Sequence, residues 1–308
     1  MNQTPENALL GRIDYELRML KGAFTSNSFY EIGSGLELKR EFIYIKVNDG
    51  QGIYTWIDYN ANGVKDLNEF EIAHYVDQAN YIRVFTPSNT YIKTYSNEFN
   101  QSFFWRPERI WETKSALKQL LARFSDQLLV RINRKTNVFN GVNAFNPFST
   151  HIRDTTLMGS TTHFKNTVYL NRTATVFGME YTFQTISNKT LLATGFDSKS
   201  NQYHEIAMRW NIQKVFGIEA TMQQGIKDAQ ADYTSGRNYS LQYRLIQPSL
   251  IYQPSTHFRL SINSRFAKKQ NALKLGGEQA RILELGTSFK FNKAENSSFH
   301  VELKCLNI

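Results

Sequence analysis

The sequence predicts a mainly β protein: a long-stranded antiparallel sheet or an outer-membrane-type barrel, closed or partial, with one or two short helices in the first half. Three observations lead to this fold class. Aromatic residues make up 14% of the chain and only 6 of its 308 residues are proline, which suits long, uninterrupted strands. Apolar and polar residues alternate with a period of two over most of the chain. The alternating segments of the second half are about 8–12 residues long, against about 5–6 for an ordinary strand.

The first strands are expected where this alternation begins. Ile13–Met19 and Ile43–Val47 each place apolar side chains on one face and polar ones on the other. Asp49–Gly50 is a turn signal, so residues 52–57 are expected to return as a further strand. Residues 81–85 alternate again.

Two segments of the first half have helical character. Residues 69–78, EFEIAHYVDQ, have Phe70 and Ala73 at helical spacing and predict a short helix. Residues 112–133 combine helical spacing of leucines with alternation at the end, so they predict a helix followed by a strand.

An Asn-rich stretch divides the chain. We expect a β-rich segment over residues 1–136, a linker over 137–150 and an antiparallel sheet or barrel segment over 151–308. The last segment is expected to hold about ten strands, separated by turn-forming stretches such as SNKT (187–190), DSKSN (197–201) and GIKDAQ (225–230). Strands of about 9–11 residues are long enough to cross a bilayer when tilted. A soluble antiparallel sandwich has the same period and remains the alternative.

Charge is spread unevenly along the chain. Residues 1–150 contain 17 Lys and Arg against 16 Asp and Glu, whereas residues 151–308 contain 19 against 11. The basic second half suits a polyanion, a glycan or acidic lipid headgroups, or it is a solvated strand face. The charges form no run, so nucleic acid is not the expected partner.

Cysteine use and the chain ends bear on location. One cysteine, Cys305, excludes an internal disulfide and suits either a reducing compartment or an envelope protein without bridges. The first residues show no signal peptide, and no apolar stretch of about 18 residues predicts a membrane-spanning helix. The last residues still alternate as a strand, so the chain is expected to be a fragment of something longer.

Residues 58–69, DYNANGVKDLNE, match a calcium-loop pattern, D-x-[DN]-x-[DN]-G-x5-E, at every fixed position. Calcium prefers six to eight oxygen ligands, which a curled loop can supply from alternate residues, and Gly63 permits the sharp turn. An Asn-rich hairpin loop is the alternative, since the same residue types form turns. The predicted Ca²⁺ ligands are Asp58, Asn60, Asn62, Val64 (through its carbonyl), Asp66 and Glu69.

This loop resembles the calcium loops of EF-hand and dockerin proteins, over residues 58–69 alone. The resemblance implies the ligand set but not the helix-loop-helix sensor, because the residues before it predict a strand. More loosely, the chain resembles the large aromatic-rich β proteins of Gram-negative outer membranes.

No catalytic constellation is visible. The six histidines are scattered, and neither a phosphate-binding glycine loop nor a nucleophile elbow is present, so we expect no enzyme. The aromatic–basic cluster of Trp105, Arg106 and Trp111 suits packing or a membrane interface better than stacking on a sugar or base.

The sequence therefore predicts a non-enzymatic protein of the bacterial outer membrane or cell envelope. Ca²⁺ would stiffen its 58–69 loop, and its partners would be membrane lipid or other envelope proteins. The alternative is a soluble β module that binds a polyanion or glycan through its basic second half. That alternative expects four arginines on one sheet face: Arg209, Arg244, Arg259 and Arg265.

Overall fold

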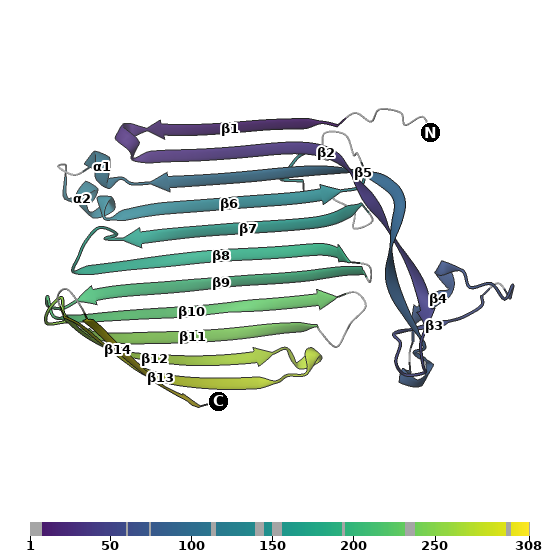
Figure 1. The fold of residues 1–308 in the computed structure, drawn as a ribbon. Coiled ribbons are helices and arrows are strands. Elements are labelled where there is room, and N and C mark those ends of the chain that lie inside the picture. Colours follow the sequence, from purple (N-terminus) through teal and green to yellow (C-terminus); the bar gives the residue numbers. More distant parts are fainter. Residues whose placement is uncertain are drawn as a thin grey trace.

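A computed structural model gives the fold of the chain (Figure 1). It describes residues 8–59, 61–73, 75–111, 115–138, 145–149, 156–192, 195–231, 238–293 and 297–307.

Twelve strands form one antiparallel sheet in the order in which they follow along the chain. Their bounds are β1 (Leu10–Met19), β2 (Phe24–Lys46), β5 (Tyr81–Trp105), β6 (Phe124–Thr136), β7 (Leu157–Leu170), β8 (Phe177–Leu192), β9 (Gly195–Asn211), β10 (Phe216–Ala231), β11 (Tyr239–Tyr252), β12 (Phe258–Asn271), β13 (Gln279–Lys293) and β14 (Ser297–Asn307). Two short strands, β3 (Tyr54–Trp56) and β4 (Phe70–Ile72), lie off this path. The mainly β, antiparallel fold class is thus confirmed.

The sheet is open. Among the described strands, β1 pairs only with β2, and β14 pairs only with β13, so neither edge meets the other. Neighbouring strands are joined at alternate ends of the sheet, and from β7 onward the connections are short (Figure 1).

The second half contains fewer and longer strands than predicted. β7 to β14 are eight strands of 11–17 residues, rather than about ten of 8–12. The reason is that expected turn stretches lie within strands: residues 187–190 are in β8, 197–201 in β9 and 225–230 in β10. They pair in register, as Ser187 does with Ser200, so the hydrogen-bonded ladder overrides their weak turn preference.

β2 and β5 extend beyond the sheet as a two-stranded ribbon. They contain 23 and 25 residues, and their pairing continues to Lys46 and Tyr81 past an irregularity between Leu38 and Arg40. The end of the ribbon carries β3, β4 and the loop between them (Figure 1). We call residues 47–80 the lobe.

Helices are short. α1 (Glu108–Trp111) and α2 (Ala116–Ala122) precede β6, and α2 followed by β6 confirms the helix and strand predicted over residues 112–133. The 3-10 helices are η1 (Leu20–Gly22), η2 (Leu67–Glu69), η3 (Val76–Gln78) and η6 (Leu273–Leu275).

The short helix expected over residues 69–78 is wrong. Residues 70–72 form β4, and only Val76–Gln78 turn, as η3. In β4 the Phe70 ring stacks on Tyr44 at 4.0 Å between centroids, and this packing outweighs the weak helical spacing.

The sheet continues across the expected linker. β6 pairs with β7 from Phe124 and Leu170 through to Thr136 and Leu157, so both halves share one sheet. Residues 145–149, the part of 139–150 that the structure describes, contact β2 and β5: the Tyr30 hydroxyl donates to the Phe145 carbonyl, and the rings of Phe99 and Phe148 lie 5.0 Å apart.

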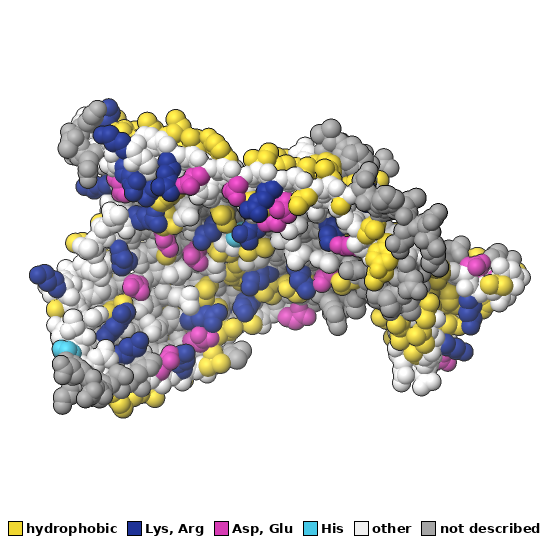
Figure 2. Space-filling view, turned by 45° about the horizontal axis from the view of Figure 1, so that its top comes forward, with side chains coloured by type: hydrophobic (Ala, Val, Ile, Leu, Met, Phe, Trp, Pro, Cys, Tyr) yellow, Lys and Arg dark blue, Asp and Glu magenta, His cyan; other side chains and the backbone are white. Residues whose placement is uncertain are grey.

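The two faces of the sheet differ in chemistry. One, the polar face, carries intermingled acidic and basic side chains, such as Glu205 on β9 and Arg265 on β12, which pairs with Glu284 at 3.1 Å. Figure 2 shows a hollowed surface with Lys and Arg mixed among Asp and Glu, as the polar face requires. The other, the apolar face, carries Ile206, Met222 and their neighbours.

Candidate functional site

The residues predicted to bind calcium connect β3 to β4 in the lobe. β3 pairs with β4 from Tyr54 opposite Ile72 to Trp56 opposite Phe70. The Ile57 amide donates to the Glu69 carbonyl at 2.9 Å and closes the base of the loop. β3 also confirms the strand predicted before the loop.

The lobe packs on the end of the ribbon through a small aromatic cluster, in which Tyr44 and Tyr81 come from the ribbon and Tyr54 and Phe70 from the lobe. Tyr44 and Tyr54 approach within 5.1 Å between ring centroids, and Phe70 and Tyr81 within 5.0 Å. Tyr54 and Tyr81 are buried. Both ends of the 58–69 loop are therefore anchored on packed rings.

The first half of the loop curls around the Asp58 carboxylate. Its Oδ1 accepts from the Asn62 amide at 3.2 Å, and its Oδ2 accepts from the Gly63 amide at 2.8 Å. Asn62 Oδ1 in turn accepts from the Val64 amide at 2.6 Å. Gly63 has φ +69°, a conformation that glycine adopts without strain, as the calcium-loop pattern requires of this position.

The second half of the loop ends in a reciprocal cap on η2. Asp66 is the N-cap, and its side chain accepts from the Glu69 amide, while Glu69 Oε2 accepts from the Asp66 amide at 3.3 Å. The same Oε2 accepts from Trp56 Nε1 at 3.0 Å. Positions 9 and 12 of the calcium pattern are thus also the N-cap and third residue of a capping box.

Glu69 is the buried carboxylate of the loop. Its residue is only 1% exposed, and its Oε1 has no hydrogen-bond partner among the described residues. A buried carboxylate oxygen without a partner is costly, so this atom favours a cation. Trp56 and the Asp66 amide fix only the other oxygen.

The structure does not bring the full ligand set together. Asp58 and Glu69 each bond to neighbouring protein groups, and Asn60 lies outside the described residues. The Val64 carbonyl accepts from the Asp66 amide at 3.1 Å. Among the described residues, no group of three or more His, Cys, Asp and Glu side chains is arranged to hold a metal ion. A bound Ca²⁺ would share the carboxylates of Asp58 and Asp66 with the backbone amides that they accept from.

Sequence reasoning missed Trp56 as the partner of Glu69. The contact joins residues 13 apart and depends on the pairing of β3 with β4. The signal in the sequence for this contact was the tryptophan two residues before the loop, whose indole N–H needs an acceptor when it is buried.

A second candidate site is the apolar face. The strand registers define a row of residues that crosses the sheet, which we call the central row. From β1 to β13 it contains Met19, Phe24, Trp105, Asp126, Val168, Tyr181, Ile206, Met222, Ile246, Phe266 and Leu283. Its members on β9 to β12 are 44–49% exposed, so this large apolar surface faces outward.

The apolar band crosses the central row obliquely. On β1 it extends from Met19 toward Leu17 and Ile13, to one side of the row. On β13 it extends from Leu283 toward Leu285 and Phe289, to the other side. The band therefore shifts along the strands from one strand to the next. This shift is expected when tilted strands cross an apolar layer of fixed thickness.

The band has different borders at its two ends on β9 to β13. Aromatic rings border one end, with Phe216 and Tyr252 at 4.9 Å and Tyr252 and Phe258 at 5.9 Å. At the other end lies the row next to the central row, which we call the basic row. It contains His204, Gln224, Arg244, Lys268 and Arg281.

The four arginines expected on one face do not share it. The registers place Arg209, Arg259 and Arg265 on the polar face and Arg244 on the apolar face. Arg265 pairs with Glu284, and Arg209 donates to the Ala174 carbonyl at 2.9 Å. The alternative, a soluble module that binds a polyanion or glycan, therefore lacks the four arginines that it expected on one face of the sheet.

The aromatic–basic cluster at the end of β5 is packed within the protein. The rings of Trp105 and Trp111 meet edge to face at 6.2 Å. Arg106 lies over the Phe104 ring at 4.6 Å and donates to the Gly22 carbonyl at 3.1 Å. These contacts favour the packing interpretation.

No protein-family model, curated protein or solved structure matches this chain. Within the part of the chain that the structure describes, no helix is long and apolar enough to cross a membrane.

Proposed function

We propose that the chain is a non-enzymatic β protein of the bacterial outer membrane or cell envelope. Its apolar face contacts lipid, and its lobe binds Ca²⁺ through the 58–69 loop. The metal stiffens the connection between β3 and β4, and thereby the end of the ribbon.

The oblique apolar band is the observation that carries the lipid proposal. On β12 the apolar residues of the band run from Phe258 to Phe266, eight residue steps, which is about 27 Å at about 3.4 Å per residue. A tilt of 35–45° reduces this to a height of about 19–22 Å, somewhat less than the apolar band of about 25 Å on outer-membrane strands. The aromatic border at one end of the band and the basic row at the other agree with a position of the band in the hydrocarbon layer.

The buried Oε1 of Glu69 supports the calcium proposal. Glu69 would close the ligand shell, Asp58, Asn60, Asn62 and Asp66 would supply side-chain oxygens, and Val64 its carbonyl. The bound ion would supply the positive charge that the buried carboxylate lacks.

Thermal melting with calcium or with chelator tests the metal site. If the loop binds Ca²⁺, a concentration of 100 times Kd adds about 2.7 kcal/mol to the free energy of unfolding. Glu69→Gln should abolish the response, because the amide removes one negative charge from the ligand set. Without calcium, stability should change little, because the neutral amide weakens the bonds to Trp56 and Asp66 but removes the cost of a buried carboxylate oxygen without a partner.

Glu71→Gln is the matched control. Glu71 is exposed, lies outside the calcium pattern, and raises the pKa of Tyr59 by hydrogen bonding to it. The calcium response should survive this change. An unresponsive wild-type protein would remove the metal from the proposal.

Membrane incorporation tests the apolar face. Ala220→Arg places a charge near the centre of the band, midway between Phe216 and Gln224, and should lower incorporation by about 2–4 kcal/mol. Thr221→Arg, one residue away, points to the polar face and should have little effect. The readout is the fraction of refolded protein that floats with phosphatidylcholine vesicles. Equal flotation of both variants would contradict lipid contact.

A further inference from the structure

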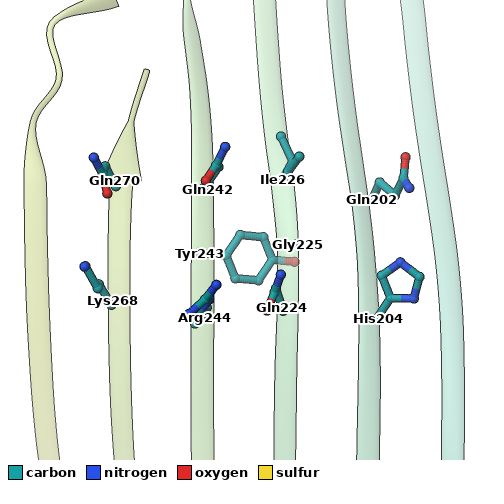
Figure 3. A pocket seen from close by; sticks show the side chains of 10 residues that line it. All are labelled: Gln202, His204, Gln224, Gly225, Ile226, Gln242, Tyr243, Arg244, Lys268 and Gln270. Carbon is teal, nitrogen blue, oxygen red and sulfur yellow. The ribbon is translucent and has the colours of Figure 1, made fainter. Parts of the chain in front are cut away.

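The basic row lies where the apolar band ends. Arg244 is paired in register with Lys268, and Lys268 with Arg281, so the three cations stand side by side on adjacent strands. All three side chains are exposed. Figure 3 shows Lys268, Arg244, Gln224 and His204 in one line.

A second row beyond the basic row is rich in amides. Gln242 and Gln270 are paired in register, and Figure 3 shows them in line with Ile226 and Gln202. Amide N–H groups can donate hydrogen bonds to an anion held by the cations. Neither row contains an acidic residue on β9 to β13.

The three cations, Arg244, Lys268 and Arg281, also lack ion-pair partners in the part of the chain that the structure describes. On the polar face of the same strands, by contrast, Arg265 pairs with Glu284. Three adjacent unpaired cations repel one another, and an external anion would relieve this.

An apolar groove adjoins the cations. It has a volume of about 510 Å³ and is lined by Arg244, Lys268 and Arg281 together with Ile246, Phe266 and Leu283 of the central row. Cations at one end and apolar side chains at the other match a molecule with an anionic head and a hydrocarbon tail.

We propose that Arg244, Lys268 and Arg281 bind the phosphate headgroup of an anionic lipid, whose acyl chain lies along Ile246, Phe266 and Leu283. The inference rests on the proposed function, since it needs the apolar face to meet lipid. It adds a specific lipid class and a position. Arginine guanidinium groups suit phosphate because their forked donors match its oxygens.

Lipid retention in nanodiscs tests the site. The full chain is reconstituted in equal parts of phosphatidylcholine and phosphatidylglycerol with identical acyl chains, and native mass spectrometry counts the lipids that remain bound. The wild type should prefer phosphatidylglycerol. Arg244→Gln, Lys268→Gln and Arg281→Gln together should lower that preference about tenfold or more. Arg244→Lys with Arg281→Lys keeps the charge and should retain part of it.

The matched control is Arg259→Gln, Lys269→Gln and Lys290→Gln, which removes the same charge from the polar face of β12 and β13. It should keep the preference. An unchanged preference in the first triple variant, or an equal loss in the control, would overturn the inference. So would binding of inorganic phosphate to the lipid-free wild type with comparable affinity.

Failure of the inference can be told from failure of the proposed function. A wild type that does not enter nanodiscs of phosphatidylcholine alone contradicts lipid contact by the apolar face. A wild type that enters but shows no preference between the two lipids contradicts only the headgroup site.

Discussion

Glu69 holds the fold of the loop, and in the proposed function it would also bind the ion. Its Oε2 holds the Asp66 amide and the Trp56 indole, while its buried Oε1 has no protein partner among the described residues. The first set of contacts orients the carboxylate in advance, so less ordering remains to be done when an ion binds.

Gly225 is a residue whose role depends on space. A Cβ there would overlap the Gln202 carbonyl and lie 2.8 Å from the Tyr243 hydroxyl, which donates to Asn201 at 3.2 Å. Figure 3 shows the Tyr243 ring beside this glycine. The absence of a side chain lets the ring lie across β10.

Gly225→Ala should therefore destabilise the protein by about 1–3 kcal/mol, because the ring or the strand must move. Gly35→Ala is the control: a Cβ at Gly35 meets nothing within 4 Å. It should be neutral or slightly stabilising, since glycine in a strand costs about 0.5–1 kcal/mol. Chemical unfolding followed by tryptophan fluorescence measures both, and equal effects would contradict the steric account.

At the scale of elements, the lobe is a separable addition to the sheet. It joins the ribbon where the Val47 amide donates to the Asn80 carbonyl at 2.9 Å, next to the last ribbon pair, Lys46 and Tyr81. β3 and β4 pair only with each other and with β5. The pairing of β1 with β2 and of β5 with β6 does not involve the lobe.

Replacing residues 47–80 by an Asn-Gly turn should leave the sheet folded and remove the calcium response. Far-UV circular dichroism and melting with and without calcium measure these two properties. The Glu69→Gln protein is the comparison, since it keeps the lobe and should lose only the calcium response. Loss of cooperative unfolding in the shortened chain would show that the sheet depends on the lobe.

Alternation predicted which segments are strands but not always which face each residue occupies. β11 is apolar on both faces, with Tyr243 and Leu245 on one and Ile246 and Leu250 on the other. The sequence alone therefore gave no basis for separating Arg244 from Arg209. Only the register, which sets Ile246 beside Met222, assigns the faces.

The candidate loop was predictable in its local features and not in its distant ones. The positive φ of Gly63 and the curl of the chain around Asp58 follow from residue types a few positions apart. The burial of Glu69 against Trp56 depends on the pairing of β3 with β4, and pairing between separate segments has no local signal.

At the scale of the whole molecule, the chain is a single open sheet with two unlike faces. Acidic and basic side chains share the polar face, and the apolar band crosses the other at an angle to the register. A soluble single-layer sheet of this size would leave a large apolar surface in water, which is unfavourable. The proposed contact of the apolar face with lipid would remove this cost.

The most direct test of lipid contact is a spin-label scan along β10 of protein in phosphatidylcholine bilayers, with Cys305→Ser to remove the native thiol. Labels occupy six consecutive positions: Ile218, Glu219, Ala220, Thr221, Met222 and Gln223. The account predicts alternation, with residues 218, 220 and 222 relaxed by oxygen and residues 219, 221 and 223 by a water-soluble nickel complex. Equal access of nickel to all six positions would contradict it.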